Sequence, residues 1–144
     1  MRLFISFALI IGVIGFAGCS EDDPVQPHEE HFEAVGVLLT NSGITLAEIY
    51  KGVTSDTLGA PLGNLSDHIE VEFLDDAKNV LAPPSDPDKK LTAVIADTTI
   101  AGFYQHEGEE GGYEFHIRGK KAGTTTIELF IEHAGHNDFR SGDI

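Results

Sequence analysis

Apolar residues recur at every second position in two short stretches of this chain. In residues 68–74 they are Ile69, Val71 and Phe73, and in residues 113–118 they are Tyr113, Phe115 and Ile117. A period of two is typical of a strand that buries one face and exposes the other. The positions predicted to face outward on these two strands are His68, Glu70, Glu72, Glu114, His116 and Arg118.

Five further stretches have the length and composition of strands, being rich in Val, Ile, Leu, Phe and Thr. They are residues 32–40, 44–51, 91–96, 99–104 and 124–132. Asn41-Ser42-Gly43 separates the first two stretches as a turn, which predicts a hairpin. Seven short strands with Gly and Pro between them predict an all-β fold, an antiparallel β-sandwich of the immunoglobulin-like class. The last residues, 141–144, stand where a further strand would be expected to begin.

The stretch 91–131 carries a more specific pattern. Ala96-Asp97 is followed by a variable segment, then by Tyr113-Glu114-Phe115, Gly119 and the run from Ala122 to Ile127. This order resembles bacterial Ig-like domains, in which an Ala-Gly-Thr turn leads into the last long strand. The resemblance implies the fold and not the activity, because such folds host many functions.

The amino terminus has the layout of a secretory signal. Arg2 is followed by an almost unbroken apolar run, Leu3–Phe16, and by the small residues Ala17 and Gly18. This run is too short for a spanning helix and predicts a signal peptide over residues 1–18. The sequence Phe16-Ala17-Gly18-Cys19 resembles the bacterial lipobox, although Phe16 stands where an aliphatic residue is usual. The resemblance implies that Cys19, the single cysteine, carries the lipid that anchors the chain to a membrane.

The segment that follows refines the expected location. Ser20-Glu21-Asp22-Asp23 resembles the acidic signal that directs Bacteroidetes-type lipoproteins to the outer face of the outer membrane. Residues 19–30 are acidic, contain Pro24 and Pro27 and have few apolar side chains, which indicates a tether. Residues 31–144 are therefore predicted to form the β-sandwich domain.

Charge narrows the range of partners. Beyond residue 18 the chain has eight basic and twenty-four acidic residues, a net charge of −16 with histidine neutral. Such a surface repels nucleic acid and anionic lipid, so no nucleic-acid partner is expected. The same charge favours cations, and it also fits simple solubility.

Histidines provide the clearest candidate chemistry. The pair His28 and His31 opens the domain, and the pair His133 and His136 follows the last predicted strand, with Asp138 close behind. Imidazole and carboxylate groups are common zinc and copper ligands. His133 continues the buried parity of residues 127–131, whereas His136 and Asp138 are predicted to lie in a loop. The preferred interpretation is a lipoprotein that binds zinc or copper and has an outer-membrane transporter or surface protein as its candidate partner.

Two other classes of function are alternatives to metal binding. A plain Ig-like adhesion or partner-binding module would need an exposed aromatic patch, for which Phe103, Tyr104 and Phe130 are the candidates. An enzyme is the least favoured class, and no catalytic residue is predicted. His28-Glu29-Glu30-His31 lacks the spacing of the helical zinc-protease motif, and the chain has no Gly-x-Ser-x-Gly elbow.

Overall fold

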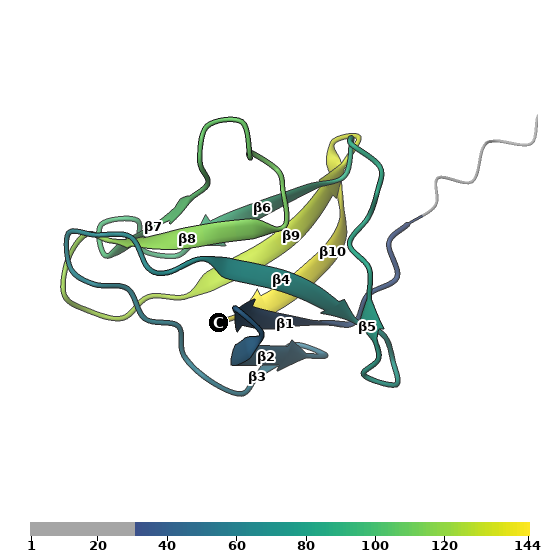
Figure 1. Cartoon of the computed structure of the whole chain (residues 1–144), viewed down its shortest axis with the longest axis horizontal. Helices are drawn as coiled ribbons and strands as arrows, with labels where there is room; N and C mark the ends of the chain where they lie inside the picture. Colours follow the sequence, from purple (N-terminus) through teal and green to yellow (C-terminus); the bar gives the residue numbers. More distant parts are fainter. Residues whose placement is uncertain (1–30) are drawn as a thin grey trace, which may run out of the picture.

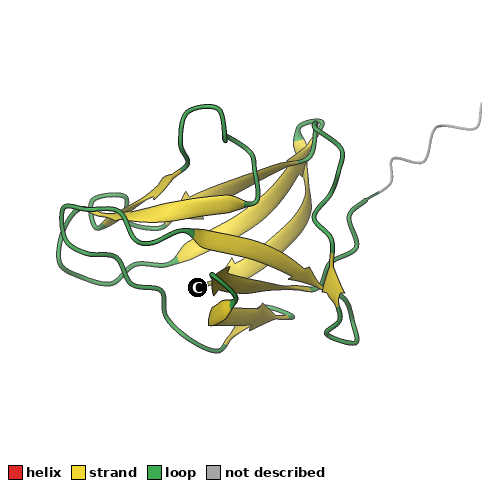
Figure 2. Cartoon of the chain, in the orientation of Figure 1, coloured by secondary structure: helices red, strands yellow, loops and turns green. Residues whose placement is uncertain are grey.

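The structure, a computed structural model, describes residues 31–144, which form antiparallel strands joined by loops and turns. Figure 1 shows these strands in two layers, and Figure 2 shows that strands and loops account for the entire described range. The first sheet has the order β3 (Val53–Thr54), β2 (Ile44–Tyr50), β1 (Gly36–Asn41), β4 (Ile69–Leu74), β8 (Glu114–Gly119) and β7 (Ala101–Tyr104), and β5 (Val80–Leu81) also pairs with β4. The second sheet has the order β10 (His136–Asp143), β9 (Ile127–His133) and β6 (Lys90–Ile95).

The predicted all-β sandwich is therefore confirmed, and so is its first hairpin. Strands β1 and β2 pair antiparallel up to Asn41 opposite Ile44, so only Ser42 and Gly43 form the loop. Both residues have positive φ, 51° and 77°. A two-residue turn with positive φ at both positions matches the right-handed twist of the flanking strands, which is why Gly is favoured there.

The core lies between the two sheets. The first sheet contributes its inward-facing positions, and the second contributes alternate residues of β9 together with single residues of β6 and β10. The largest fully buried side chains are Phe73, Phe115, Leu39, Ile49, Ile69, Leu91, Leu129, Ile131 and Val37. The alternation in the sequence thus correctly identified the buried faces of β4, β8 and β9.

Three strands were not predicted, and two of them contain only two residues. The third, β10, corrects the prediction that His136 and Asp138 lie in a loop. Its sequence hides the alternation because Phe139 is its only large apolar residue, while Ser141, a polar residue, is 2% exposed. The pairing of β10 with β9 also shifts register twice, near Asn137 and between Arg140 and Asp143.

The edges of the two sheets also meet. Strand β10 approaches β2 and β3, and β6 approaches β7. The hydroxyl of Thr54 donates to the carbonyl of Asp143 across the first of these seams. Within residues 31–144 there is no helix of the length and apolarity needed to cross a membrane.

Candidate metal centre

A tight hairpin turn places His133 and His136 opposite one another. The two residues are register partners at the end of β9 and β10, and only Ala134 and Gly135 lie between them. Both turn residues have positive φ, 48° and 84°, and Gly135 adopts this conformation without a steric penalty. The two imidazole rings lie 5.6 Å apart at an angle of 60°.

Asp138 lies at the centre of this end of the sandwich. Its side chain is 0% exposed. Its Oδ1 atom lies 2.9 Å from Nε2 of His136 and 3.1 Å from Nδ1 of His31. The fold therefore brings His31, the first described residue, next to a carboxylate 107 positions later in the sequence.

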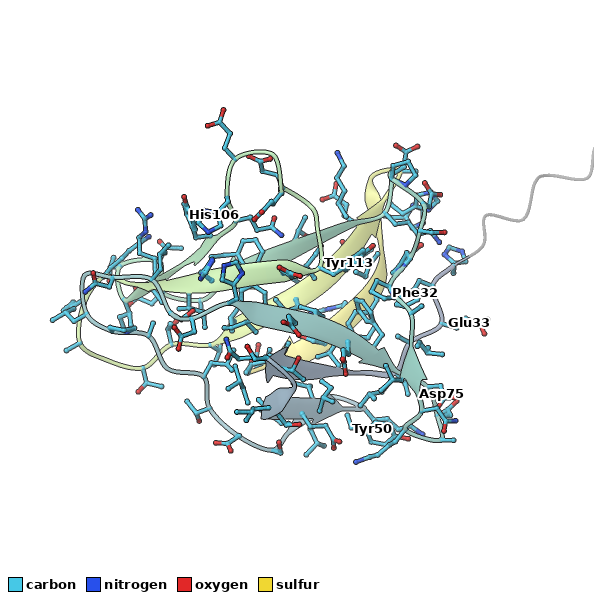
Figure 3. The ribbon with its side chains drawn as sticks, in the orientation of Figure 1. Phe32, Glu33, Tyr50, Asp75, His106 and Tyr113 are labelled. Carbon is cyan, nitrogen blue, oxygen red and sulfur yellow. The ribbon has the colours of Figure 1, made fainter. Side chains whose placement is uncertain are left out.

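Phe32 explains why His31 reaches this position. Figure 3 labels Phe32 where the chain enters the domain, and its ring packs edge-on against Phe73 in the core, with 4.7 Å between centroids. The backbone of Val35 then donates to the carbonyl of Leu74, which continues the alignment of this segment with β4. His31 itself remains largely exposed, at 63% of its side chain.

The other oxygen of Asp138 faces a different set of groups. Oδ2 lies 3.0 Å from Nζ of Lys89, whose side chain is 8% exposed, and 3.5 Å from Nδ1 of His133. His133 also approaches Asp86, with 3.9 Å between Nε2 and Oδ2. Burial raises the pKa of Asp138, but the hydrogen bonds from His31 and Lys89 and the charge of Lys89 outweigh it and lower that pKa to about 2. Asp138 is consequently a carboxylate at neutral pH.

The ligand-type atoms fall into two groups around Asp138. One atom each from His31, His136 and Asp138 lie within 4.8 Å of one another, which is close enough to hold one metal ion. Two imidazoles and a carboxylate form a donor set suited to zinc or copper. His133, also predicted as a ligand, lies against the opposite oxygen. A surface pocket of ≈ 280 Å³, lined in part by His31, Lys89 and His133, adjoins the group.

Two predicted site residues, Cys19 and His28, lie outside the described residues. The three aromatic residues considered for an adhesive surface are placed, and they do not form an exposed patch. Phe130 is 8% exposed, and Phe103 and Tyr104 are half-buried. Phe103 stacks on Phe115, and Tyr104 lies beneath the guanidinium of Arg118.

Sequence reasoning missed a second histidine group, formed by His68, His106 and His116. His116 was predicted to face solvent, but it is 6% exposed, because His68, Tyr104 and His106 cover it on the outer face of β8. The alternation correctly placed His116 on the outer face; what it lacked was the identity of the neighbouring strands. His68 opens one predicted strand, His106 follows another and His116 lies in the middle of a third, so only the strand order shows that the three histidines meet.

Comparison with protein-family models, with characterised proteins and with solved structures finds no match to this chain.

Proposed function

We propose that this protein is an exported lipoprotein, anchored in the outer membrane through Cys19, whose β-sandwich binds a zinc or copper ion at Asp138. The observation that carries the metal-binding proposal is the convergence of His31 and His136 on one oxygen of a buried carboxylate. The domain presents the ion site and the lipid keeps it at the membrane. We expect no catalytic activity; delivery of the ion to an outer-membrane transporter, or buffering of it, fits this arrangement.

The spacing of the donor atoms supports the proposal. Two ligands of a tetrahedral ion with bonds of about 2.0–2.1 Å lie roughly 3.3 Å apart. The distances of 2.9 and 3.1 Å from Oδ1 to the two imidazole nitrogens are close to that value. An ion can therefore be bound between these three atoms with little movement of the backbone.

Lys89 lowers the expected affinity for a metal ion, but it does not occupy the oxygen of Asp138 that the two imidazoles approach. Its ammonium group is bound to Oδ2, whereas the two imidazoles meet at Oδ1. The positive charge of Lys89 repels a cation, so we expect moderate affinity rather than the tight binding of a structural zinc site.

Calorimetric titration of the full chain with zinc and copper tests the proposal. The protein carries Cys19→Ala and no polyhistidine tag, so that neither a thiol nor a tag binds metal. We expect His136→Ala to weaken binding at this site by about 100-fold, at least as much as the loss of a ligand-supporting residue. His133→Ala is the matched control from the same hairpin and should weaken binding much less.

Equal affinity in His136→Ala and the reference protein would overturn the metal site. Partner binding by the sandwich, without metal, would then become the working hypothesis. If His133→Ala weakens metal binding as much as His136→Ala does, the ion is bound on the other oxygen of Asp138.

A further inference from the structure

A second group of histidines lies on the outer face of the first sheet and shares no residue with the Asp138 site. Strands β4 and β8 pair with Ile69 opposite Phe115 and Glu70 opposite Glu114. Extending this register by one residue sets His68 directly across from His116. Residues opposite one another on the same face of a sheet have Cβ atoms about 5 Å apart. The two rings accordingly lie 4.2 Å apart in an edge-to-face arrangement.

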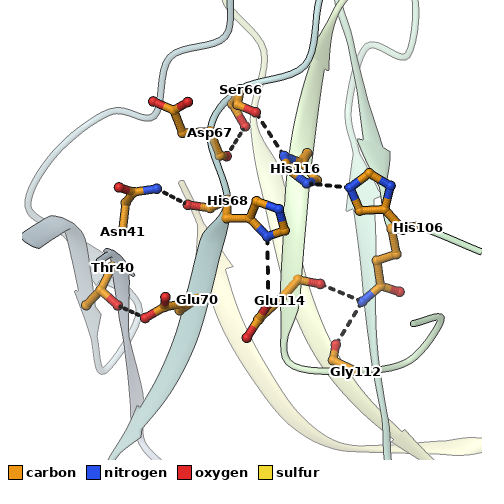
Figure 4. A network of polar contacts seen from close by, with 11 residues as sticks. Thr40, Asn41, Ser66, Asp67, His68, Glu70, His106, Gly112, Glu114 and His116 are labelled. Carbon is orange, nitrogen blue, oxygen red and sulfur yellow. Dashed lines mark hydrogen bonds and ion pairs between the residues drawn. The ribbon is translucent and has the colours of Figure 1, made fainter. Parts of the chain in front are cut away.

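The third histidine arrives from the other neighbour of β8. Tyr104 of β7 is the register partner of His116. His106 follows Tyr104 by two positions, just beyond the end of β7, and its Nε2 lies 3.1 Å from Nε2 of His116. Figure 4 shows His68 and His106 on either side of His116, and Figure 3 shows His106 well separated from Phe32 along the long axis.

The backbone fixes which nitrogen of His116 is available. Nδ1 lies 2.8 Å from the carbonyl oxygen of Ser66. A carbonyl only accepts, so Nδ1 donates and Nε2 of the neutral ring presents its lone pair toward His106. Ser66 is itself held by two bonds with Ile117, one from its amide to the Ile117 carbonyl and one from the Ile117 amide to its hydroxyl. A carbonyl on the far nitrogen is a common partner of metal-binding histidines.

A carboxylate lies near the ring of His68. Oε2 of Glu114 is 3.7 Å from its Nδ1, an ion-pair distance rather than a hydrogen bond. One nitrogen from each of the three histidines falls within 4.8 Å of the others. The separation of 3.1 Å between the Nε2 atoms of His106 and His116 also approaches the roughly 3.3 Å expected for two nitrogens on one tetrahedral ion.

We propose that His68, His106 and His116 form a second metal site, which takes a zinc or divalent copper ion. Imidazole nitrogens suit these ions, whereas calcium and magnesium prefer oxygen ligands. Three imidazole ligands leave the charge of the ion uncompensated, and the carboxylate of Glu114, 3.7 Å from Nδ1 of His68, offsets part of it. The ion's remaining position is available to water or to a small exogenous ligand, as in three-histidine zinc sites. This inference does not rest on the Asp138 site.

The test is a titration of the full chain, again with Cys19→Ala and without a tag, with Zn²⁺ and with Cu²⁺. Removal of His116 could unfold the protein because it is buried, so the variants are His106→Gln and His68→Ala. Each variant should bind one metal ion fewer, or bind it about 100-fold more weakly. The ion at the Asp138 site, which His136→Ala should remove, should remain bound. Glu70→Gln is the matched control on the same face and should retain that equivalent. With Cu²⁺, the nitrogen hyperfine pattern in electron paramagnetic resonance should simplify in His106→Gln.

The outcomes separate the two sites. If His106→Gln and His68→Ala both bind as the reference protein does, the three-histidine site is overturned, whatever His136→Ala shows. If Glu70→Gln weakens binding as much as the histidine variants, the ion is held by the general acidity of this face and the proposal fails. Loss in the histidine variants with no effect of His136→Ala would support this site and refute only the one at Asp138.

Discussion

The ring of Phe32 meets the ring of Phe73 edge-on, at 4.7 Å and 86°. Phe73 is completely buried and also receives the edges of Tyr113 and Phe139. The residue after His31 is therefore packed into the core, and this contact determines the position of His31 relative to Asp138.

Replacement of this anchor should affect both the fold and the Asp138 site. Phe32→Ala is expected to lower the free energy of unfolding by about 2 kcal/mol through lost burial and ring contact. His31 would no longer be held near Asp138, so zinc affinity should fall together with stability. Urea unfolding and zinc titration measure the two effects. Phe32→Leu keeps the apolar contact and should retain most of both; full zinc affinity in Phe32→Ala would show that His31 needs no anchor.

The fold was largely predictable because the alternation of β4, β8 and β9 survives in the sequence. Where the sequence did not predict a strand, the structure shows a physical reason. Strand β10 buries Ser141, whose hydroxyl accepts from the amide of Leu129 and thereby compensates for a polar residue in the core. Register shifts on either side of Phe139 break the period of two. A pattern of polar and apolar residues cannot reveal such a strand.

The sites were predictable only as far as local sequence determines them. His133 and His136 could be paired because two turn residues separate them. The approach of His31 depends on the packing of Phe32, and the meeting of His68 with His116 depends on β4 lying next to β8. Strand order is a global property, so the histidine group on the outer face had no local signature.

The proposed lipid anchor predicts that the protein changes location when Cys19 is removed. Cys19→Ala should move the protein from the membrane fraction to the soluble fraction, because acylation contributes about 0.8 kcal/mol for each buried methylene group. Incorporation of labelled fatty acid should disappear from the same variant. Ser20→Ala is the neighbouring control and should stay acylated. Continued membrane association of Cys19→Ala without label would point to another mode of attachment.

Tyr113 predicts a loss of stability at alkaline pH. Burial, with a smaller contribution from the charge of Asp86, raises the pKa of its hydroxyl to about 12, and the hydroxyl donates to the carbonyl of Lys89. The unfolded chain ionises at about pH 10, so the unfolded state loses its proton first. The stabilisation from the neutral phenol should be intact below pH 10 and decline from there toward pH 12.

Chemical unfolding at several pH values, together with the ultraviolet absorbance of tyrosinate, measures this effect. Tyr113→Phe should be less stable at neutral pH by about 1 kcal/mol for the lost hydrogen bond, but its stability should decline less between pH 10 and 12. An equal decline in both proteins would assign the alkaline effect to other groups.

Lys89 separates the structural role of Asp138 from its proposed role as a ligand. Lys89→Met keeps the apolar stem but leaves a buried carboxylate without its cation, so the metal-free protein should lose about 3 kcal/mol of unfolding free energy. The pKa of Asp138 should rise from about 2.

Zinc affinity of Lys89→Met should increase, roughly tenfold, because a repelling charge has gone, and added zinc should restore part of the stability. Titration and urea unfolding with and without zinc measure both effects. Unchanged zinc binding would mean that the ion is held too far from Lys89 for Asp138 to be its ligand.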